Sequence, residues 1–135
     1  MRTEGMLAPS SADDAREWYG ALGPAAQTVV REIARSMSFD REEYGERVTG
    51  EVVETARDAL FASLLEVHVG TDREFEEWRA DFDGEVHVVG SENVSRVAWH
   101  AVGREAVAAT FENEPGAAVD TLRRQAFGRL YREHL

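Results

Sequence analysis

The spacing of apolar residues changes near residue 65, and this change constrains the fold more than any other feature of the sequence. Up to about residue 64 the apolar residues recur every three to four positions, which is the period of an amphipathic helix. From there the period is two, because Leu65, Val67 and Val69 alternate with Glu66 and His68. Helices therefore precede a sheet in one chain, which is typical of the α+β class.

Start and stop signals divide the first half of the chain into four predicted helices. Ser11 is a favourable N-cap for the first helix, and Gly23-Pro24 ends that helix and opens the second. A capping box that begins at Asp40 predicts a short third helix, and Thr49 can cap a fourth. The first 64 residues are therefore predicted to be almost entirely helical.

The second of these helices has the clearest apolar face. At 100° per residue its apolar side chains fall within about 100° of one another. They are Ala26, Val29, Val30, Ile33 and Met37. Since the charged residues of this segment lie on the other side, we expect the apolar face to be buried.

The second half of the chain contains three further strand-like runs, at residues 85–89, 94–101 and 106–111. The segments between them, 90–93 and 102–105, are short enough for antiparallel hairpins. With the strand that starts near residue 65, these runs predict a four-stranded, mostly antiparallel sheet.

Two more helices complete the prediction. Thr71 opens a capping box for a helix that crosses the sheet, and Pro115 opens a C-terminal helix packed on the sheet. No linker rich in proline, glycine or serine divides the chain. We therefore expect one α+β domain over residues 1–135, with a helical part at about 11–64 and the sheet with its C-terminal helix at about 65–135.

The charge of the chain points to a salt-rich environment. The 135 residues include 26 acids and 15 bases, a net charge of −11, and every basic residue is arginine. Such self-repulsion is screened at about 1 M salt, where the Debye length is about 3 Å. No apolar stretch approaches the roughly 18 residues of a membrane helix, and no secretory signal opens the sequence. We expect a soluble, halophilic, cytoplasmic protein with no membrane partner.

Missing residue types exclude several classes of chemistry. Without lysine the chain cannot form a Schiff base or a P-loop phosphate site. Without cysteine it has no thiol nucleophile, disulfide or thiolate metal site. The patterns G-x-G-x-x-G, G-x-S-x-G and H-E-x-x-H are also absent.

Three segments of the sequence resemble a known family. They are A-L-G-P-A-A-Q-T-V-V-R-E-I-A-R at 21–35, S-E-N-V-S-R-V-A-W-H-A at 91–101 and T-L-R-R-Q-A-F-G-R-L-Y-R-E at 121–133. Together they are similar to a small family of uncharacterised haloarchaeal proteins, domain of unknown function 5809. The resemblance covers most of the chain. It implies a halophilic origin and brings with it no activity, cofactor or catalytic residue.

Three histidines fall in predicted strands, namely His68, His87 and His100. Each alternates with apolar residues, so neighbouring strands could bring the imidazoles together on one polar face of the sheet. Three imidazoles with an open position suit zinc. The alternative is that one face of an antiparallel sheet is wet and the histidines are only solvated. No cofactor is otherwise expected.

Charge is distributed unevenly along the chain. Residues 1–93 hold 21 acids and 9 arginines, whereas residues 94–135 hold 5 acids and 6 arginines. Four of these arginines lie in the C-terminal helix, at Arg123, Arg124, Arg129 and Arg132. They could contact RNA. Nucleic acid is disfavoured as a partner because phosphate binding weakens steeply with salt, and we expect the arginines to pair with the chain's own acids instead.

The C-terminal helix has an apolar arc of about 180°, wider than the roughly 100° stripe of a helix that packs on one sheet. Phe127 and Tyr131 lie on this arc with Arg123, and Arg124 follows on its flank. Aromatic residues with arginine are typical of interface cores. The arc predicts either a surface shared with a second chain or burial within one chain.

The sequence therefore favours a non-catalytic binding or regulatory module that acts through protein contacts, either as a homo-oligomer or with another protein, by way of the C-terminal helix. A histidine-based metal-dependent enzyme and an RNA-associated protein are the alternatives.

Overall fold

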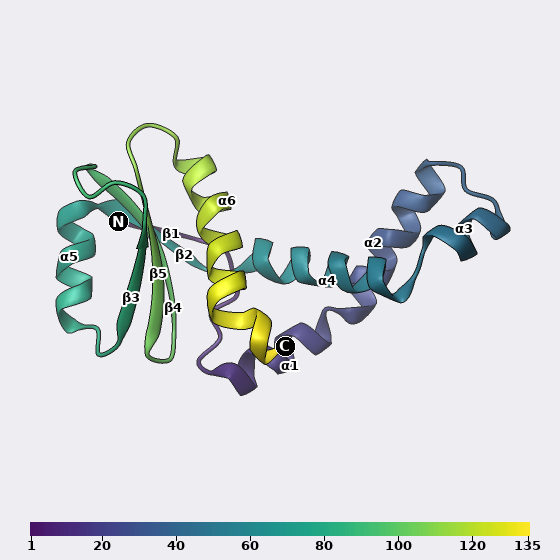
Figure 1. Ribbon diagram of the computed structural model, residues 1–135, viewed down its shortest axis with the longest axis horizontal. Coiled ribbons are helices and arrows are strands. Elements are labelled where there is room, and N and C mark those ends of the chain that lie inside the picture. The colour runs from purple at the N-terminus through teal and green to yellow at the C-terminus, as the bar shows by residue number, and fades with distance from the viewer. The chain divides into compact units, whose positions relative to one another are not determined.

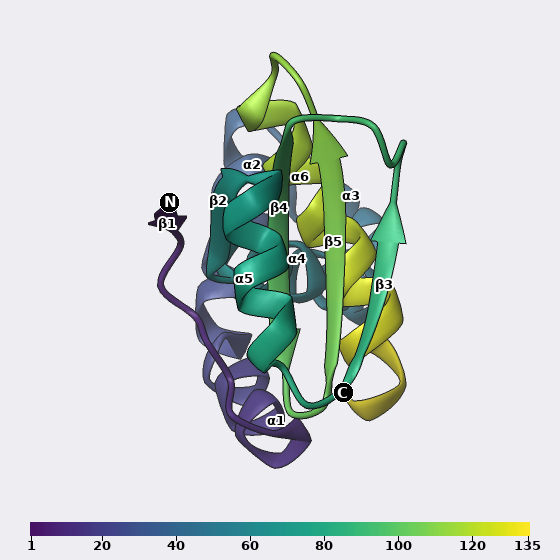
Figure 2. The same ribbon diagram turned by 90° about the vertical axis from the view of Figure 1, so that its left-hand side faces the viewer.

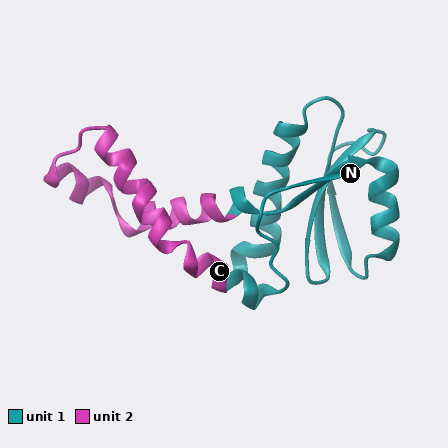
Figure 3. Cartoon of the chain, turned by 180° about the vertical axis from the view of Figure 1, so that it is seen from behind, with its two compact units in different colours: residues 1–16, 62–135 teal, residues 17–61 magenta.

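Six α-helices and a five-stranded mixed sheet make up the chain, and the computed structural model describes all of residues 1–135. The predicted α+β class is confirmed. The chain forms two compact units, which Figure 3 shows in different colours. Residues 1–16 and 62–135 form one, here called the sheet unit, and residues 17–61 form the other, here called the helical unit.

The sheet has one more strand than the sequence predicts and is not wholly antiparallel. Its strands are β1 (Arg2–Glu4), β2 (Val67–Thr71), β3 (Glu85–Val89), β4 (Arg96–Val102) and β5 (Glu105–Phe111). They lie in the order β1-β2-β4-β5-β3, and every neighbouring pair is antiparallel except β3 with β5, which is parallel.

The predicted hairpin over residues 102–105 is confirmed, and the one over residues 90–93 is wrong. Strands β4 and β5 pair directly through a turn in which Gly103 has a φ of 59°. Strand β3 pairs with β5 instead of β4, and the chain leaves β3 at Gly90, whose φ is 101°. The physical reason is that β4 and β5 are nearly continuous apolar runs, which need cover on both faces, so they occupy the centre. The more polar β3 takes the edge (Figure 2).

One helix covers each face of the sheet (Figure 1). On one side is α5 (Asp72–Asp81), which begins with the predicted capping box at Thr71 and Glu74. Its face of the sheet carries a core of Phe75, Val97, Trp99 and Ala108, with Trp78 and Val86 partly buried beside it. Trp99 thus lies in the core, and Trp78 packs against it.

On the other side of the sheet is α6 (Pro115–Ala126), which continues as a π-helix over Phe127–Tyr131 and a short 3-10 turn over Arg132–His134. The buried side chains of α6 are Ala118, Val119, Leu122 and Ala126. Both faces of the central strands are therefore covered within the sheet unit.

The first four helices begin where the sequence predicts. They are α1 (Ala12–Ala21), α2 (Gly23–Ser36), α3 (Arg41–Arg47) and α4 (Gly50–Leu64), and α1 and α4 each continue into the sheet unit. Ser11, Asp40 and Thr49 each accept a hydrogen bond from a backbone N–H in the following turn, as N-caps do.

Inside the helical unit, Tyr19 of α1 meets α4. Its ring lies edge-on to Phe61, with centroids 5.9 Å apart, and its hydroxyl donates to Asp58 Oδ1 at 2.5 Å. The Arg57 guanidinium lies 5.0 Å from the same ring. Burial, followed by this bond to Asp58, raises the pKa of Tyr19 to about 12.

None of the helices in the chain is both long and apolar enough to span a bilayer.

Candidate functional sites

The three histidines proposed for a metal site do not come together. His68 lies on the face covered by α5, with its ring centroid 5.6 Å from that of Trp99. His87 and His100 lie on the α6 face, but His87 is on the edge strand β3 and His100 is on β4, with β5 between them. The prediction required three adjacent strands whose histidines share one face, and neither condition is met.

His100 is part of a buried hydrogen-bond chain between the sheet and the C-terminal helix. It is only 2% exposed, and its two ring nitrogens contact the Glu66 carbonyl oxygen at 2.6 Å and the Tyr131 hydroxyl at 2.5 Å. A carbonyl can only accept, so Nδ1 carries the proton and Nε2 accepts from Tyr131. With both nitrogens engaged, His100 has no lone pair left for a metal.

Burial shifts the pKa values of both His100 and Tyr131 in the direction that favours the neutral side chain. Burial lowers the pKa of His100 to about 4, and the nearby charges of His68 and Arg123 act in the same direction. Burial also raises the pKa of Tyr131 well above its ordinary value, with a further contribution from Asp14. Both side chains are therefore neutral near pH 7, and the pair fastens the π-helical segment to β4.

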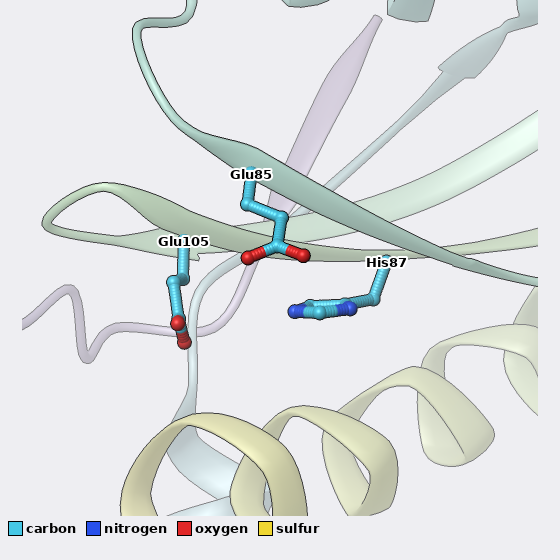
Figure 4. A group of neighbouring side chains, drawn as sticks. All are labelled: Glu85, His87 and Glu105. Carbon is cyan, nitrogen blue, oxygen red and sulfur yellow. The ribbon is translucent and has the colours of Figure 1, made fainter.

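His87 belongs to a different group of metal-binding residue types. One ligand atom from each of Glu85, His87 and Glu105 lies within 4.8 Å of the others. Figure 4 shows all three side chains on the same face of the sheet, at the start of β3 and β5. Sequence reasoning missed the two glutamates because the parallel pairing of β3 with β5, which sets Glu85 opposite Glu105, is not evident from the sequence. The one signal for this group in the sequence is the i, i+2 spacing of Glu85 and His87, which places both side chains on one face of a strand.

The structure places the aromatic interface candidates of the C-terminal helix in the interior. Phe127 is 5% and Tyr131 is 1% exposed, so neither side chain is available to a partner. The wide apolar arc is explained by burial within one chain. Arg123, which lies inside the arc, donates from Nε to the main-chain oxygen of Leu65 at 3.1 Å, and Arg124 lies near Thr121.

The expected pairing of the C-terminal arginines with the chain's own acids is not found. The Arg129 Nε donates to Gln125 Oε1 at 3.1 Å, and the Arg132 guanidinium lies 5.4 Å from the Phe127 ring centre. None of the four arginines of this helix takes part in a salt bridge. They stabilise the helix and its packing through neutral partners.

A cavity of about 520 Å³ in the sheet unit lies between the ends of β3 and β5 and the start of α6. Its lining includes Thr110, Thr121 and Asn113 together with two acids, Glu112 and Glu114, and contains no histidine or arginine. Its polar side chains are therefore hydroxyls, an amide and carboxylates, without a cationic group beside them.

The helical unit contains an apolar groove of about 440 Å³ between α2, α3 and α4. Seven of its eight lining residues are apolar and one is charged. They are Val30, Ile33, Ala34, Met37, Phe39, Val48, Val52 and Arg47.

The walls of this groove are open to solvent. Ile33 is 54%, Met37 58% and Val52 42% exposed. The buried face predicted for the second helix is therefore only half formed. Ala26 and Val30 are buried, but the neighbouring strip, made of Val29 and Ile33 of α2 and of Met37 directly after it, is uncovered. Exposed apolar residues that lie together in this way mark a binding surface more often than single exposed residues do.

Comparisons with known proteins give a family and no function. A family model described as "Family of unknown function (DUF5809)" matches residues 6–132. Neither a curated protein nor a solved structure matches the chain.

Proposed function

This chain belongs to the DUF5809 family of unknown function, and we propose that it is a protein-binding module whose helical unit holds an apolar segment of another protein. The observation that carries this proposal is the open groove between α2, α3 and α4, where Ile33 and Met37 are more than half exposed. The C-terminal helix favoured by the sequence has no comparable surface, since its aromatic side chains are buried.

The shape and chemistry of the groove suit an amphipathic helix. Such a helix binds by placing apolar side chains from successive turns into a groove between helices. Taking a fully exposed side chain of the size of isoleucine or methionine to full burial contributes about 1.5–3 kcal/mol, and about half of this remains for side chains that are already half-buried. Ile33, Met37 and Val52 together could therefore supply a substantial part of a binding energy while α2 keeps its conformation.

Arg47 adds a charge preference. It lines the groove, its guanidinium lies 5.7 Å from the Phe39 ring centre, and it forms no salt bridge within the chain. A carboxylate on the partner would find in Arg47 a cation that is already positioned by the aromatic ring. The expected partner segment is therefore a helix with an apolar stripe and an acidic residue beside it.

Selection from a random peptide display library against the whole chain would test this function. We expect the selected peptides to carry apolar residues at helical spacing, and to lose binding when Ile33→Glu or Met37→Glu places a charge in the groove. Thr28→Glu is the matched control, because it adds the same charge to an exposed position on the opposite side of α2. Peptides that bind all three variants equally well would contradict the proposal.

Charge reversal at Arg47 gives a second test of the same site. Arg47→Glu is expected to weaken peptides with an acidic residue beside the apolar stripe and to strengthen their lysine-substituted counterparts. An equal effect on both peptides would remove Arg47 from the binding site. Sedimentation of the wild type over a wide concentration range tests whether the groove binds a second copy of the chain instead of another protein. A dimer that is lost in Ile33→Glu would assign the groove to self-association.

A further inference from the structure

Two carboxylates and an imidazole converge at the edge of the sheet without any partner from the chain. Glu85 and Glu105 are directly opposite each other in the parallel register of β3 and β5, and His87 follows Glu85 on the same face. One ligand atom from each lies within 4.8 Å of the others, and Figure 4 shows the three side chains gathered on the side of the sheet that faces α6.

This placement is unfavourable for the chain alone. Like charges on directly opposite residues destabilise a sheet. No salt bridge or side-chain hydrogen bond neutralises either glutamate, and the nearest arginine in sequence, Arg104, pairs with Asp83 instead. A bound cation would turn the repulsion into attraction.

We propose that Glu85, His87 and Glu105 bind one divalent transition-metal ion of the zinc or manganese type, with water in the remaining positions. The donor set supports this class of ion, because imidazole suits zinc and carboxylate suits both zinc and manganese, whereas magnesium and calcium prefer oxygen alone. Since the chain has no cysteine, a thiolate site for zinc does not compete with this one.

Only a small adjustment of the side chains is needed. Zinc binds nitrogen and oxygen at about 2.0–2.2 Å, which sets the ligand atoms about 3.4 Å apart in a tetrahedral site. Glu85 and Glu105 are exposed and His87 is half-buried, so their rotamers can close this difference while the strands stay in place. The ion would join the edge strand β3 to β5, and the site does not depend on the groove of the helical unit.

Calorimetric titration of the chelator-treated whole chain with zinc chloride, and separately with manganese chloride, tests the site. We expect one ion per chain, and at least a tenfold loss of affinity in both His87→Ala and Glu105→Gln. His68→Ala is the matched control, because His68 Nε2 lies 3.9 Å from Glu66 Oε1 in a pair that lacks a third ligand. Two results would overturn the proposal. One is a loss of affinity in His68→Ala equal to that in His87→Ala, and the other is an unchanged affinity in all three variants. Either result would mean an adventitious ion only.

A measurement on the unmodified chain guards against variants that fail to fold. Zinc is expected to shift the imidazole proton resonances of His87 in the NMR spectrum and to leave those of His68 and His100 in place. Absence of binding to the wild type, or a shift confined to another histidine, would also overturn the proposal.

Discussion

The buried contact between His100 and Tyr131 predicts a specific loss of stability in mild acid. The perturbation is protonation of His100, which is 2% exposed and has both ring nitrogens in hydrogen bonds. A protonated ring could no longer accept from the Tyr131 hydroxyl, and its charge would lie in the interior. The folded chain therefore resists protonation at this residue more than the unfolded chain does.

The size and direction of the effect follow from the two pKa values. Burial lowers the pKa of His100 from 6.5 to about 4 in the folded chain. In the pH range between these values the unfolded chain binds more protons, so the free energy of unfolding falls as the pH is lowered through this window. A difference of roughly 2.5 in pKa, at about 1.36 kcal/mol for each pKa unit, gives a loss of about 3 kcal/mol from this residue.

Urea unfolding followed by circular dichroism, at a series of pH values between 7.5 and 4 and in about 1 M KCl to screen the carboxylates, would measure this loss. The comparison is the double variant His100→Leu with Tyr131→Phe, which removes both side-chain partners of the buried bond. We expect the wild type to lose about 3 kcal/mol more than the double variant over this range. Equal pH dependence in the two proteins, or an ordinary pKa for His100 by NMR titration, would show that protonation of His100 does not cause the loss of stability in acid.

Four further predictions concern the charge, the core, the helical unit and a helix cap. Because the net charge is −11, the melting temperature should rise as KCl is increased to about 1 M, and a flat or falling curve would contradict halophilic adaptation. Phe127→Ala should cost about 3–5 kcal/mol in urea unfolding, whereas Ile33→Ser should change stability by about 0.5 kcal/mol or less, and similar costs would contradict the assigned burial. Tyr19→Phe should remove a component near pH 12 from the ultraviolet titration of the tyrosines, and an unchanged titration would contradict the bond to Asp58. Thr71→Ala should cost about 1 kcal/mol, and no loss would mean that the capping box of α5 is dispensable.

The features that the sequence predicts correctly are those that depend on neighbouring residues. A cap such as Ser11 or Asp40 bonds a backbone N–H three residues on, so its signal lies within one turn. The hairpin at 102–105 is equally local, because its turn residues and its two strands are contiguous. The start of α6 at Pro115 follows from the fixed φ of proline.

The features that the sequence does not reveal depend on pairing between distant segments. The position of β3 beside β5, and the short edge strand β1, are set by which strands need cover on both faces. The group of Glu85, His87 and Glu105 is a product of that pairing. Two similar apolar faces also differ in burial, which the sequence does not reveal. The arc containing Phe127 is covered within the chain, whereas the strip of α2 that contains Ile33 is left open, and periodicity alone does not distinguish them.

The position of the helical unit in the chain has a consequence for the order of folding. Residues 17–61 separate the N-terminal segment of the sheet unit from the rest of it. Strand β1 must therefore find β2 across a long loop, since Thr3 and its partner His68 are 65 residues apart. Closing a loop costs more entropy as it lengthens, and contacts between close neighbours form sooner than distant ones. The β4–β5 hairpin and the helices can form from local contacts. We therefore expect β1 to join the sheet late and, as a three-residue edge strand, to be among the first segments to detach.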